Sequence, residues 1–322
     1  MATFPSTPST SGAAAAAAAA DDDDDAAALV LEAALQAQAE AEIGEPATLE
    51  GKRAQLAELR RRIAALPRTQ DRLQDTSARN LVRFLRLSKH KMDKAVGRTV
   101  EYARFFASNH AHLGGMQPEA ELPVFRNLVQ VLEDVPGTEG RVVVCLFPKL
   151  AVSNITAAML AQNPRILLRM NVWVFERLSL DVRVQVRGLI LLNSFRDADT
   201  AAAVPLSQLA NLSERRLAFQ FFSLMGFRLK VAMVFEEPAF LSWAWFIIKQ
   251  FTSAKVRERF LLCGTDYARL DAVLGEAARR HLPEPFKSLG ASAAVVGGER
   301  PSWILEQIAA DAAEKAARAT RE

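Results

Sequence analysis

The chain has 322 residues, of which 50% are apolar and 24% are charged, and its formal net charge is +3. A chain of this length can bury a sizeable core, and this composition is that of an ordinary globular protein rather than a disordered or fibrous one. The small net charge excludes a protein whose whole surface binds polyanions. We therefore expect no nucleic-acid partner and assign any phosphate contact to local basic clusters.

Residues 1–46 are expected to form a disordered low-complexity segment. This segment contains "TPSTSG", "AAAAAAAADDDDD" and then an Ala/Gln/Glu-rich stretch, a composition that offers little to bury. We predict at most a transient helix near 26–41. The segment also lacks the basic start and leucine-rich core of a secretory signal, which favours a cytoplasmic protein.

A helical N-terminal unit is predicted over residues 47–116. Apolar residues recur at helical spacing in "TLEGKRAQLAELRRRIAAL", "DTSARNLVRFLRLS" and "MDKAVGRTVEYARFFASN". Asp75 or Thr76 is expected to cap the second of these helices, and Asp93 the third.

Over residues 117–290 the sequence pattern changes to predicted strands that alternate with predicted helices. The runs "RVVVCLF", "GLILLNSF" and "LKVAMVF" are short and β-rich, and such strands are buried on both faces of a parallel or mixed sheet. Helical stretches at about 153–178 and 207–225 separate them, and "RFLLCG" is expected to be a fourth strand before a helix at "DYARLDAVLG". Residues 291–322 are predicted to form a C-terminal tail with one polar, Ala-rich helix after Pro301.

A search for catalytic, metal and nucleotide motifs finds no set that carries chemistry. His110 and His112 are close in sequence, but no cysteine or third ligand stands near them, so a helix-end loop explains them better than a metal site. No G-x-G-x-x-G, P-loop or G-x-S-x-G pattern follows a strand. Cys145 and Cys263 lie in apolar runs and are expected to be reduced core residues. We expect no enzyme activity, metal or cofactor.

The stretch "EEPAFLSWAWFIIKQFTSAKVRERF" at 236–260 joins an apolar block to a basic run. Pro238 suits the first turn of a helix, and the block is far shorter than the roughly 20 residues that cross a bilayer. A helix that is apolar on every side is expected in a core. The alternative is a lid that covers an apolar cavity with one face and meets lipid with the other.

The order and spacing of these segments resemble the CRAL-TRIO lipid-binding family, in particular its tocopherol-transfer and retinaldehyde-binding types. "NLVRFLRLSKHKMDKA" is similar to the family's helical motif, "EGRVVVCLF" to its first strand, and "VRGLILLNSF" to its central strand. "GFRLKVAMVFEEPAFLSWAWFIIKQFTSAKVRERFLLCGTDYARL" resembles its strand, N-x-P turn, gate helix and closing segment. The resemblance covers about 75–290. It implies an α/β fold in which a helical N-terminal unit accompanies a mixed sheet flanked by helices that enclose an apolar pocket.

The resemblance also implies site residues, with a gate helix at Pro238–Phe251. The implied pocket lining is Val144, Leu146, Met159, Met170, Phe175, Ile190, Leu192, Met233, Phe235, Phe240, Trp243 and Ile247. Basic residues beside the gate, with two of its aromatic residues, would meet phosphoinositide headgroups on an anionic membrane. This second set is Arg228, Lys230, Trp245, Phe246, Lys255 and Arg259. The simpler alternatives are core packing for the apolar residues and solvated charges for the basic ones.

The chain departs from the family pattern at positions that bear on the ligand. Asn193 stands where the family commonly has aspartate, and Glu236 where it has asparagine. Val256 and Arg259 stand where phosphatidylinositol-transfer members have threonine and lysine, which favours a neutral hydrophobic ligand.

The function implied by the resemblance is binding of one hydrophobic, lipid-like molecule and its transfer between membranes. The carrier would be a cytoplasmic monomer that associates peripherally with membranes. The first alternative is a lipid-sensing regulatory module that transfers nothing. The second is an enzyme that acts on a lipid in the same pocket.

Overall fold

The computed structural model describes residues 25–321 except 74, 115, 149–154, 197–211, 226, 240, 243–244, 246–248, 250–253 and 292–301. The chain divides into two compact units, one ending at Arg104 and the other beginning at Phe105. This boundary lies within a helix and precedes the end at 116 that the sequence favours for the helical unit.

The first unit is helical. Its elements are α2 (Ala33–Ile43), α3 (Leu49–Ala64), the 3-10 turn η1 (Thr69–Asp71), α4 (Ala78–Leu87) and most of α5 (Met92–Ser108). The cap of α4 is Ser77 rather than Asp75 or Thr76, because the Ser77 hydroxyl accepts a hydrogen bond from the Asn80 N–H at 3.4 Å. Helix α5 already begins at Met92, so Asp93 lies in its first turn and pairs with Arg62 at 2.6 Å.

Residues 25–46 include an ordered part of this unit, which corrects the prediction of disorder for that range. Leu35, Ala39 and Ile43 lie at helical spacing along α2 and are buried. Gly44 ends the helix in the left-handed conformation, with φ of 71°, and its N–H bonds to Glu40 O. Leu29 upstream of the helix is buried as well.

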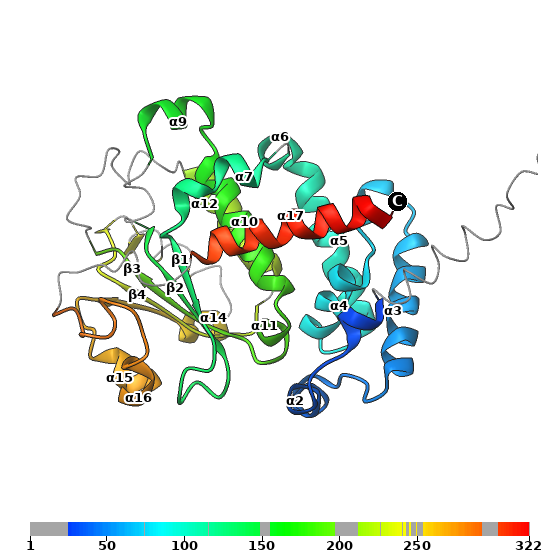
Figure 1. The fold of residues 1–322 in the computed structure, drawn as a ribbon, viewed down its shortest axis with the longest axis horizontal. Helices are drawn as coiled ribbons and strands as arrows, with labels where there is room; N and C mark the ends of the chain where they lie inside the picture. The colour runs from blue at the N-terminus through cyan, green and yellow to red at the C-terminus, as the bar shows by residue number, and fades with distance from the viewer. Residues whose placement is uncertain are drawn as a thin grey trace, which may run out of the picture. The chain divides into compact units, whose positions relative to one another are not determined.

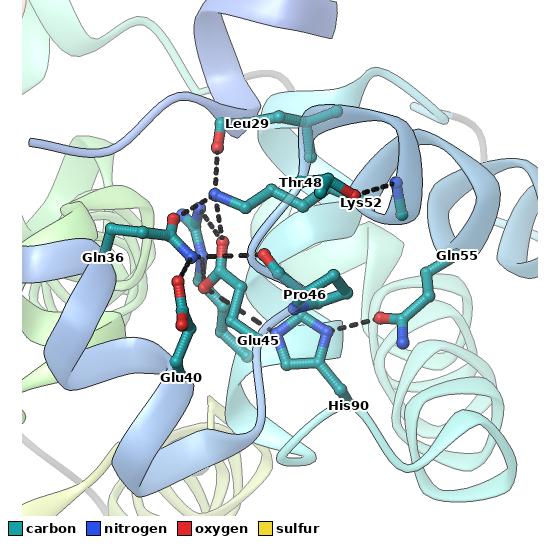
Figure 2. A network of polar contacts seen from close by, with 11 residues as sticks. Leu29, Gln36, Glu40, Glu45, Pro46, Thr48, Lys52, Gln55 and His90 are labelled. Carbon is teal, nitrogen blue, oxygen red and sulfur yellow. Dashed lines mark hydrogen bonds and ion pairs between the residues drawn. The ribbon is translucent and has the colours of Figure 1, made fainter. Parts of the chain in front are cut away.

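An ion network around Glu45 fastens this segment to α3 and α4 (Figure 2). The buried Glu45 carboxylate accepts two hydrogen bonds from Arg86, both at 2.9 Å, and lies 3.1 Å from Lys52 Nζ. Lys52 also donates to Leu29 O at 2.8 Å, and His90 Nε2 lies 3.7 Å from the carboxylate. Burial raises the pKa of Glu45. The contact with His90, the hydrogen bonds from Arg86 and the charges of Arg86 and Lys52 outweigh burial and bring that pKa to about 2.

The second unit is built on a five-stranded mixed sheet flanked by helices, which confirms the predicted fold class (Figure 1). The strands are β1 (Val129–Leu132), β2 (Val142–Leu146), β3 (Leu189–Ser194), β4 (Leu229–Phe235) and β5 (Phe260–Gly264). They lie in the order β1-β2-β3-β4-β5, with β1 antiparallel to β2 and the other pairs parallel. Strands β2 to β5 fall within the four predicted runs, whereas β1 was not predicted.

Helices surround this sheet. They are α6 (His110–Leu113), α7 (Pro118–Glu121), the 3-10 turn η2 (Pro123–Phe125), α9 (Ala157–Gln162), α10 (Ile166–Leu180), α11 (Val182–Val186), α12 (Leu212–Met225), α14 (Ala254–Arg259), α15 (Arg269–Leu274), α16 (Glu276–Arg279) and α17 (Trp303–Arg321). The predicted helix at 153–178 is two helices, because Pro164 lies in the turn between α9 and α10.

The C-terminal helix α17 is confirmed, and it belongs to the second unit. Its Ile304 is buried, and the rings of Trp303 and Trp173 meet edge to face with their centres 6.2 Å apart. Asp311 pairs with Arg177 at 2.7 Å. The apolar contacts at one end and the ion pair further along hold α17 against α10.

The pairing register assigns strand residues to two faces of the sheet. Residues that pair across parallel strands share a face, and side chains alternate along each strand. The first face carries Val143, Cys145, Ile190, Leu192, Val231, Met233 and Phe235. The second face carries Val142, Val144, Leu146, Leu189, Leu191, Asn193, Ala232 and Val234. Side chains from 267–286 fill the first face, and α10 and α12 lie on the side of the sheet away from α15 and α16 (Figure 1).

Candidate ligand-binding site

The sheet separates the strand residues that were expected to line one pocket. Val144 and Leu146 lie on the second face, whereas Ile190, Leu192, Met233 and Phe235 lie on the first. The last four are buried in one core cluster with residues of the C-terminal segment. A single pocket cannot be lined by both faces of a sheet, so these four are removed from the predicted lining.

Aromatic packing fills the first face at its carboxyl end. The Phe235 and Tyr267 rings stack with centres 4.5 Å apart, and the Phe286 ring meets Phe235 edge to face at 5.8 Å. Phe147 packs against Phe286 at the same distance. This face therefore functions as the structural core of the unit.

The helical residues of the predicted lining lie on α9 and α10. Met170 and Phe175 are buried in α10, and Met159 is half-buried in α9. Phe175 contacts the rings of Phe222 and Phe227, with centres 5.1 and 5.7 Å away. Phe222 belongs to α12 and Phe227 precedes β4, so an aromatic cluster joins α10 and α12 to the amino end of the sheet.

The predicted gate residues Phe240, Trp243, Phe246 and Ile247 lie outside the described residues. Trp245 is described, and it is half-buried with its ring 4.3 Å from the ring of Phe260. Phe260 pairs with Ala232 and therefore lies on the second face. In this structure Trp245 packs toward the sheet.

The second face is apolar and yet reached by solvent. Asn193 is the one residue of β3 that is not buried, although β3 is the middle strand of five. Its neighbours across the sheet, Leu146 and Val234, are only 8% and 2% exposed. Phe260 and Leu262 on β5 are half-buried on the same face. Asn193, Phe260 and Leu262 on this face are therefore reached by solvent beside buried apolar side chains.

A polar network fixes the chain where it leaves β4 toward the predicted gate, and no sequence motif indicated it. The Tyr267 hydroxyl donates to Glu236 Oε1 at 3.1 Å and lies 3.2 Å from the buried Ser194 hydroxyl. Burial raises the pKa of Tyr267, and Glu236 acts in the same sense, so the phenol stays protonated as a donor. Arg196 Nη1 bonds to Gly290 O at 2.6 Å.

Backbone contacts extend this network to the edge strand. Glu236 N–H donates to Gly264 O at 2.8 Å, and Gly264 N–H donates to Glu237 Oε2 at 3.0 Å. Glu236 has a positive φ of 51°, a conformation that costs roughly 1–3 kcal/mol in a residue with a side chain. These contacts hold that conformation and anchor the segment that follows β4 at the end of β5.

Three of the four predicted headgroup residues meet at the amino end of β4. Arg228 Nη1 donates to Val186 O, and Arg259 Nη1 donates to Leu229 O at 2.5 Å. Lys230 is exposed. The side chain of Lys255 is outside what the structure describes. Both arginines are thus tied to the backbone, and Lys230 is the exposed cation of the group.

The described residues provide no metal centre and no membrane-spanning helix. No three His, Cys, Asp or Glu side chains among them come together as ligands of one ion. None of the described helices has both the length and the hydropathy needed to cross a membrane.

Comparison with known proteins finds similarity to solved structures. No protein-family model matches the chain. No curated protein matches it either. The chain is similar to the crystal structure of Sfh5, with 13% identical residues and a TM-score of 0.45, over 89% of this chain and 99% of that one.

Proposed function

We propose that the second unit binds one hydrophobic, lipid-like molecule over the second face of its sheet and carries it between membranes. The observation that carries this proposal is the solvent access of Asn193 in a middle strand whose neighbouring side chains are apolar and buried. Ligand sites in parallel α/β sheets commonly lie at the carboxyl ends of the strands, and sites for small molecules are mostly apolar with few polar groups.

The energetic basis of binding is removal of apolar surface from water. Each buried methylene group of a ligand contributes about 0.8 kcal/mol, so a long alkyl chain supplies enough for tight binding before losses of rigid-body freedom. The second face has no charged group to desolvate at the residues that would contact the ligand, which are Val144, Leu146, Leu191 and Val234.

Release at a membrane requires the cover over the second face to move. Trp245 lies on Phe260 of the edge strand, so its ring covers part of the second face at its β5 side. Tryptophan favours the bilayer interface, and contact with lipid would stabilise a state in which Trp245 leaves Phe260. Glu236 and Glu237 hold the start of this segment at Gly264, so the anchored end stays with the sheet as the cover opens.

A transfer assay tests the proposal. The purified full-length chain is mixed with donor vesicles that carry a pyrene-labelled neutral lipid and with unlabelled acceptor vesicles. We expect the chain to accelerate movement of the label in proportion to its concentration. Tight binding of the label without faster movement would support a lipid sensor and contradict transfer.

Membrane docking is proposed to depend on the basic cluster beside the cover. A lysine near an anionic surface contributes about 1 kcal/mol, so replacing Lys230 and Lys255 by alanine together is expected to weaken vesicle binding roughly 30-fold. Vesicle co-sedimentation at low ionic strength with phosphoinositide-containing lipid measures this effect. Arg259 is excluded from the variant because its bond to Leu229 O supports the strand.

The matched control replaces two other exposed lysines of the same unit, Lys287 and Lys315. It removes the same charge and is expected to leave vesicle binding nearly unchanged. Equal losses in the two double variants would show that net charge, rather than this cluster, governs docking.

A further inference from the structure

We propose that the helical unit contains a binding site for a phosphate group, and that the chain's own Glu45 occupies this site in the structure (Figure 2). Residues 25–46, which we call the strap, are then an autoinhibitory segment that leaves when phosphate binds. All the residues concerned belong to the first unit, so this site is independent of the lipid site proposed for the second.

The side chains around Glu45 are of the kinds that proteins use to bind phosphate. Arg86 donates to both carboxylate oxygens at 2.9 Å, a two-point contact that fits phosphate as well as carboxylate. Lys52 Nζ lies 3.1 Å from one of these oxygens. The side chains of Lys52 and Arg86 are only 5% and 1% exposed, so both cations are held away from bulk water. These two cations share the single negative charge of Glu45, whereas a phosphate group carries up to two charges.

His90 supplies a third group, and Glu45 does not satisfy it. Its Nδ1 lies 2.6 Å from Gln55 Oε1, so this nitrogen carries a hydrogen and donates it to the amide oxygen. Its Nε2 faces Glu45 Oε2 at 3.7 Å, which is too long for a hydrogen bond. Within the described part of the chain Nε2 has no hydrogen-bond partner, although the His90 side chain is only 5% exposed. A buried, unpartnered nitrogen directed at the carboxylate points to a ligand with more oxygens than Glu45 offers.

A phosphate group would complete the contacts that the carboxylate leaves open. Both oxygens of Glu45 already accept from Arg86, and neither reaches His90. A phosphate monoester has three terminal oxygens. Two of them can take the places of the carboxylate oxygens, and the third can accept from His90 Nε2 when the imidazole is protonated. An uncharged ligand would leave the buried cations without a counter-charge, which is unfavourable.

The strap is attached in a way that allows it to leave while the core of the helical unit stays intact. That core is a cluster built by α3, α4, α5 and the chain between α3 and α4, and among its buried members Leu29 alone comes from the strap. The buried residues of α2 do not belong to this cluster. Carboxylates hold the strap at both ends, Glu45 at one and Asp25, which pairs with Arg60, at the other. An anion therefore competes with the strap for the groups that hold it, through a local opening of the unit.

Hydrogen exchange of the α2 amides in the full-length chain measures release of the strap. Inorganic phosphate is the soluble probe, with sodium chloride at equal ionic strength as its blank. The membrane probe is vesicles of phosphatidylcholine with phosphatidic acid, whose headgroup is a phosphate monoester, and vesicles of phosphatidylcholine alone are the blank. We expect exchange of α2 to accelerate about tenfold when the probe is at ten times its dissociation constant from the open form, while exchange of α17 is unchanged.

Two substitutions test the assigned residues. His90→Asn removes Nε2 but keeps a residue that tolerates the left-handed backbone at this position, where φ is 54°. It is expected to raise the phosphate concentration for half-maximal release about tenfold, because one hydrogen bond to a charged group is lost. Glu45→Gln removes the charge of the internal competitor and is expected to lower that concentration about tenfold. Glu58→Gln is the matched control, because Glu58 also pairs with two arginines but on the exposed surface of α3.

The pattern of release distinguishes the sources of phosphate. Release by inorganic phosphate identifies a soluble ligand, and release by the phosphatidic acid vesicles alone identifies a lipid headgroup. No release by either probe would overturn the site. An unchanged half-maximal concentration in His90→Asn would overturn the phosphate geometry, and an equal change in Glu58→Gln and Glu45→Gln would show a general effect of charge. If circular dichroism shows that Glu45→Gln does not fold, the wild-type and His90→Asn measurements still decide the question.

Discussion

Replacing Glu45 by alanine is expected to lower the free energy of unfolding of the helical unit by about 3–5 kcal/mol, because it removes one partner of a buried ion network. Arg86 and Lys52 would remain buried without the carboxylate that accepts from one and pairs with the other. The segment before α3 would also lose its main polar attachment. Urea denaturation followed by circular dichroism measures the change.

Glu58→Ala is the matched control for this prediction. Glu58 also pairs with two basic side chains, Arg61 and Arg62, but on the exposed surface of α3. Exposed ion pairs contribute little because water screens them, so its removal is expected to shift the unfolding midpoint far less than Glu45→Ala. Similar shifts in the two variants would contradict the view that the Glu45 network holds the segment.

The same carboxylate predicts how stability depends on pH. The pKa of Glu45 falls from its ordinary 4.5 to about 2 in the folded chain, so the unfolded state binds the proton more readily. The contribution of Glu45 to stability is therefore complete above pH 4.5 and is lost as the pH falls toward 2. Unfolding free energies of wild type and Glu45→Gln should converge over this interval, whereas a constant difference would contradict the prediction.

Replacing Gly188 by alanine is expected to destabilise the second unit by about 2–4 kcal/mol, from backbone strain and a lost hydrogen bond. Gly188 precedes β3 with φ of 86°, where a Cβ atom is unfavourable, and this atom would lie 2.1 Å from Arg228 O. That carbonyl accepts the Leu189 N–H at 3.2 Å, so relief of the clash would break a contact between β3 and β4. Thermal unfolding of Gly188→Ala and of the wild type measures this loss of stability.

Gly275→Ala separates the two causes. Gly275 has a similar φ of 83°, but a Cβ atom there meets nothing within 4 Å. Its substitution is expected to cost only the conformational term, about 1 kcal/mol. Equal losses at the two glycines would show that the close approach to Arg228 O adds nothing.

The sheet was largely predictable because buried parallel strands appear as compact apolar runs. The sequence "LILLNS" predicts β3 without knowledge of the strands that pair with it. The antiparallel edge strand β1, with the sequence "VQVL", is too short and too mixed to stand out. The pairing partner that defines it, β2, lies ten or more residues further along the chain.

Which strand residues face a ligand could not be derived from the same runs. Where every position of a strand is apolar, alternation no longer distinguishes the faces, so Leu192 and Leu191 are equivalent in sequence. The register with β2 and β4 assigns Leu192 to the core and Leu191 to the second face. Asn193 interrupts the apolar run of β3, and it was the available signal for a solvent-reached position on the second face.

The ordered N-terminal segment was hidden for a different reason. Its helix α2 is rich in alanine and glutamine, and composition alone favours disorder. The order depends on Glu45 meeting Arg86, which lies 41 residues away in sequence. Such a pairing is a property of the folded unit, and no local pattern encodes it.

Native mass spectrometry of the purified full-length chain, followed by organic extraction, tests lipid binding most directly. The account predicts a population heavier than the polypeptide, which loses the excess mass on denaturation and yields an uncharged lipid in the extract. A chain that appears only at the polypeptide mass, and remains so after incubation with labelled hexadecanol, would contradict the central claim.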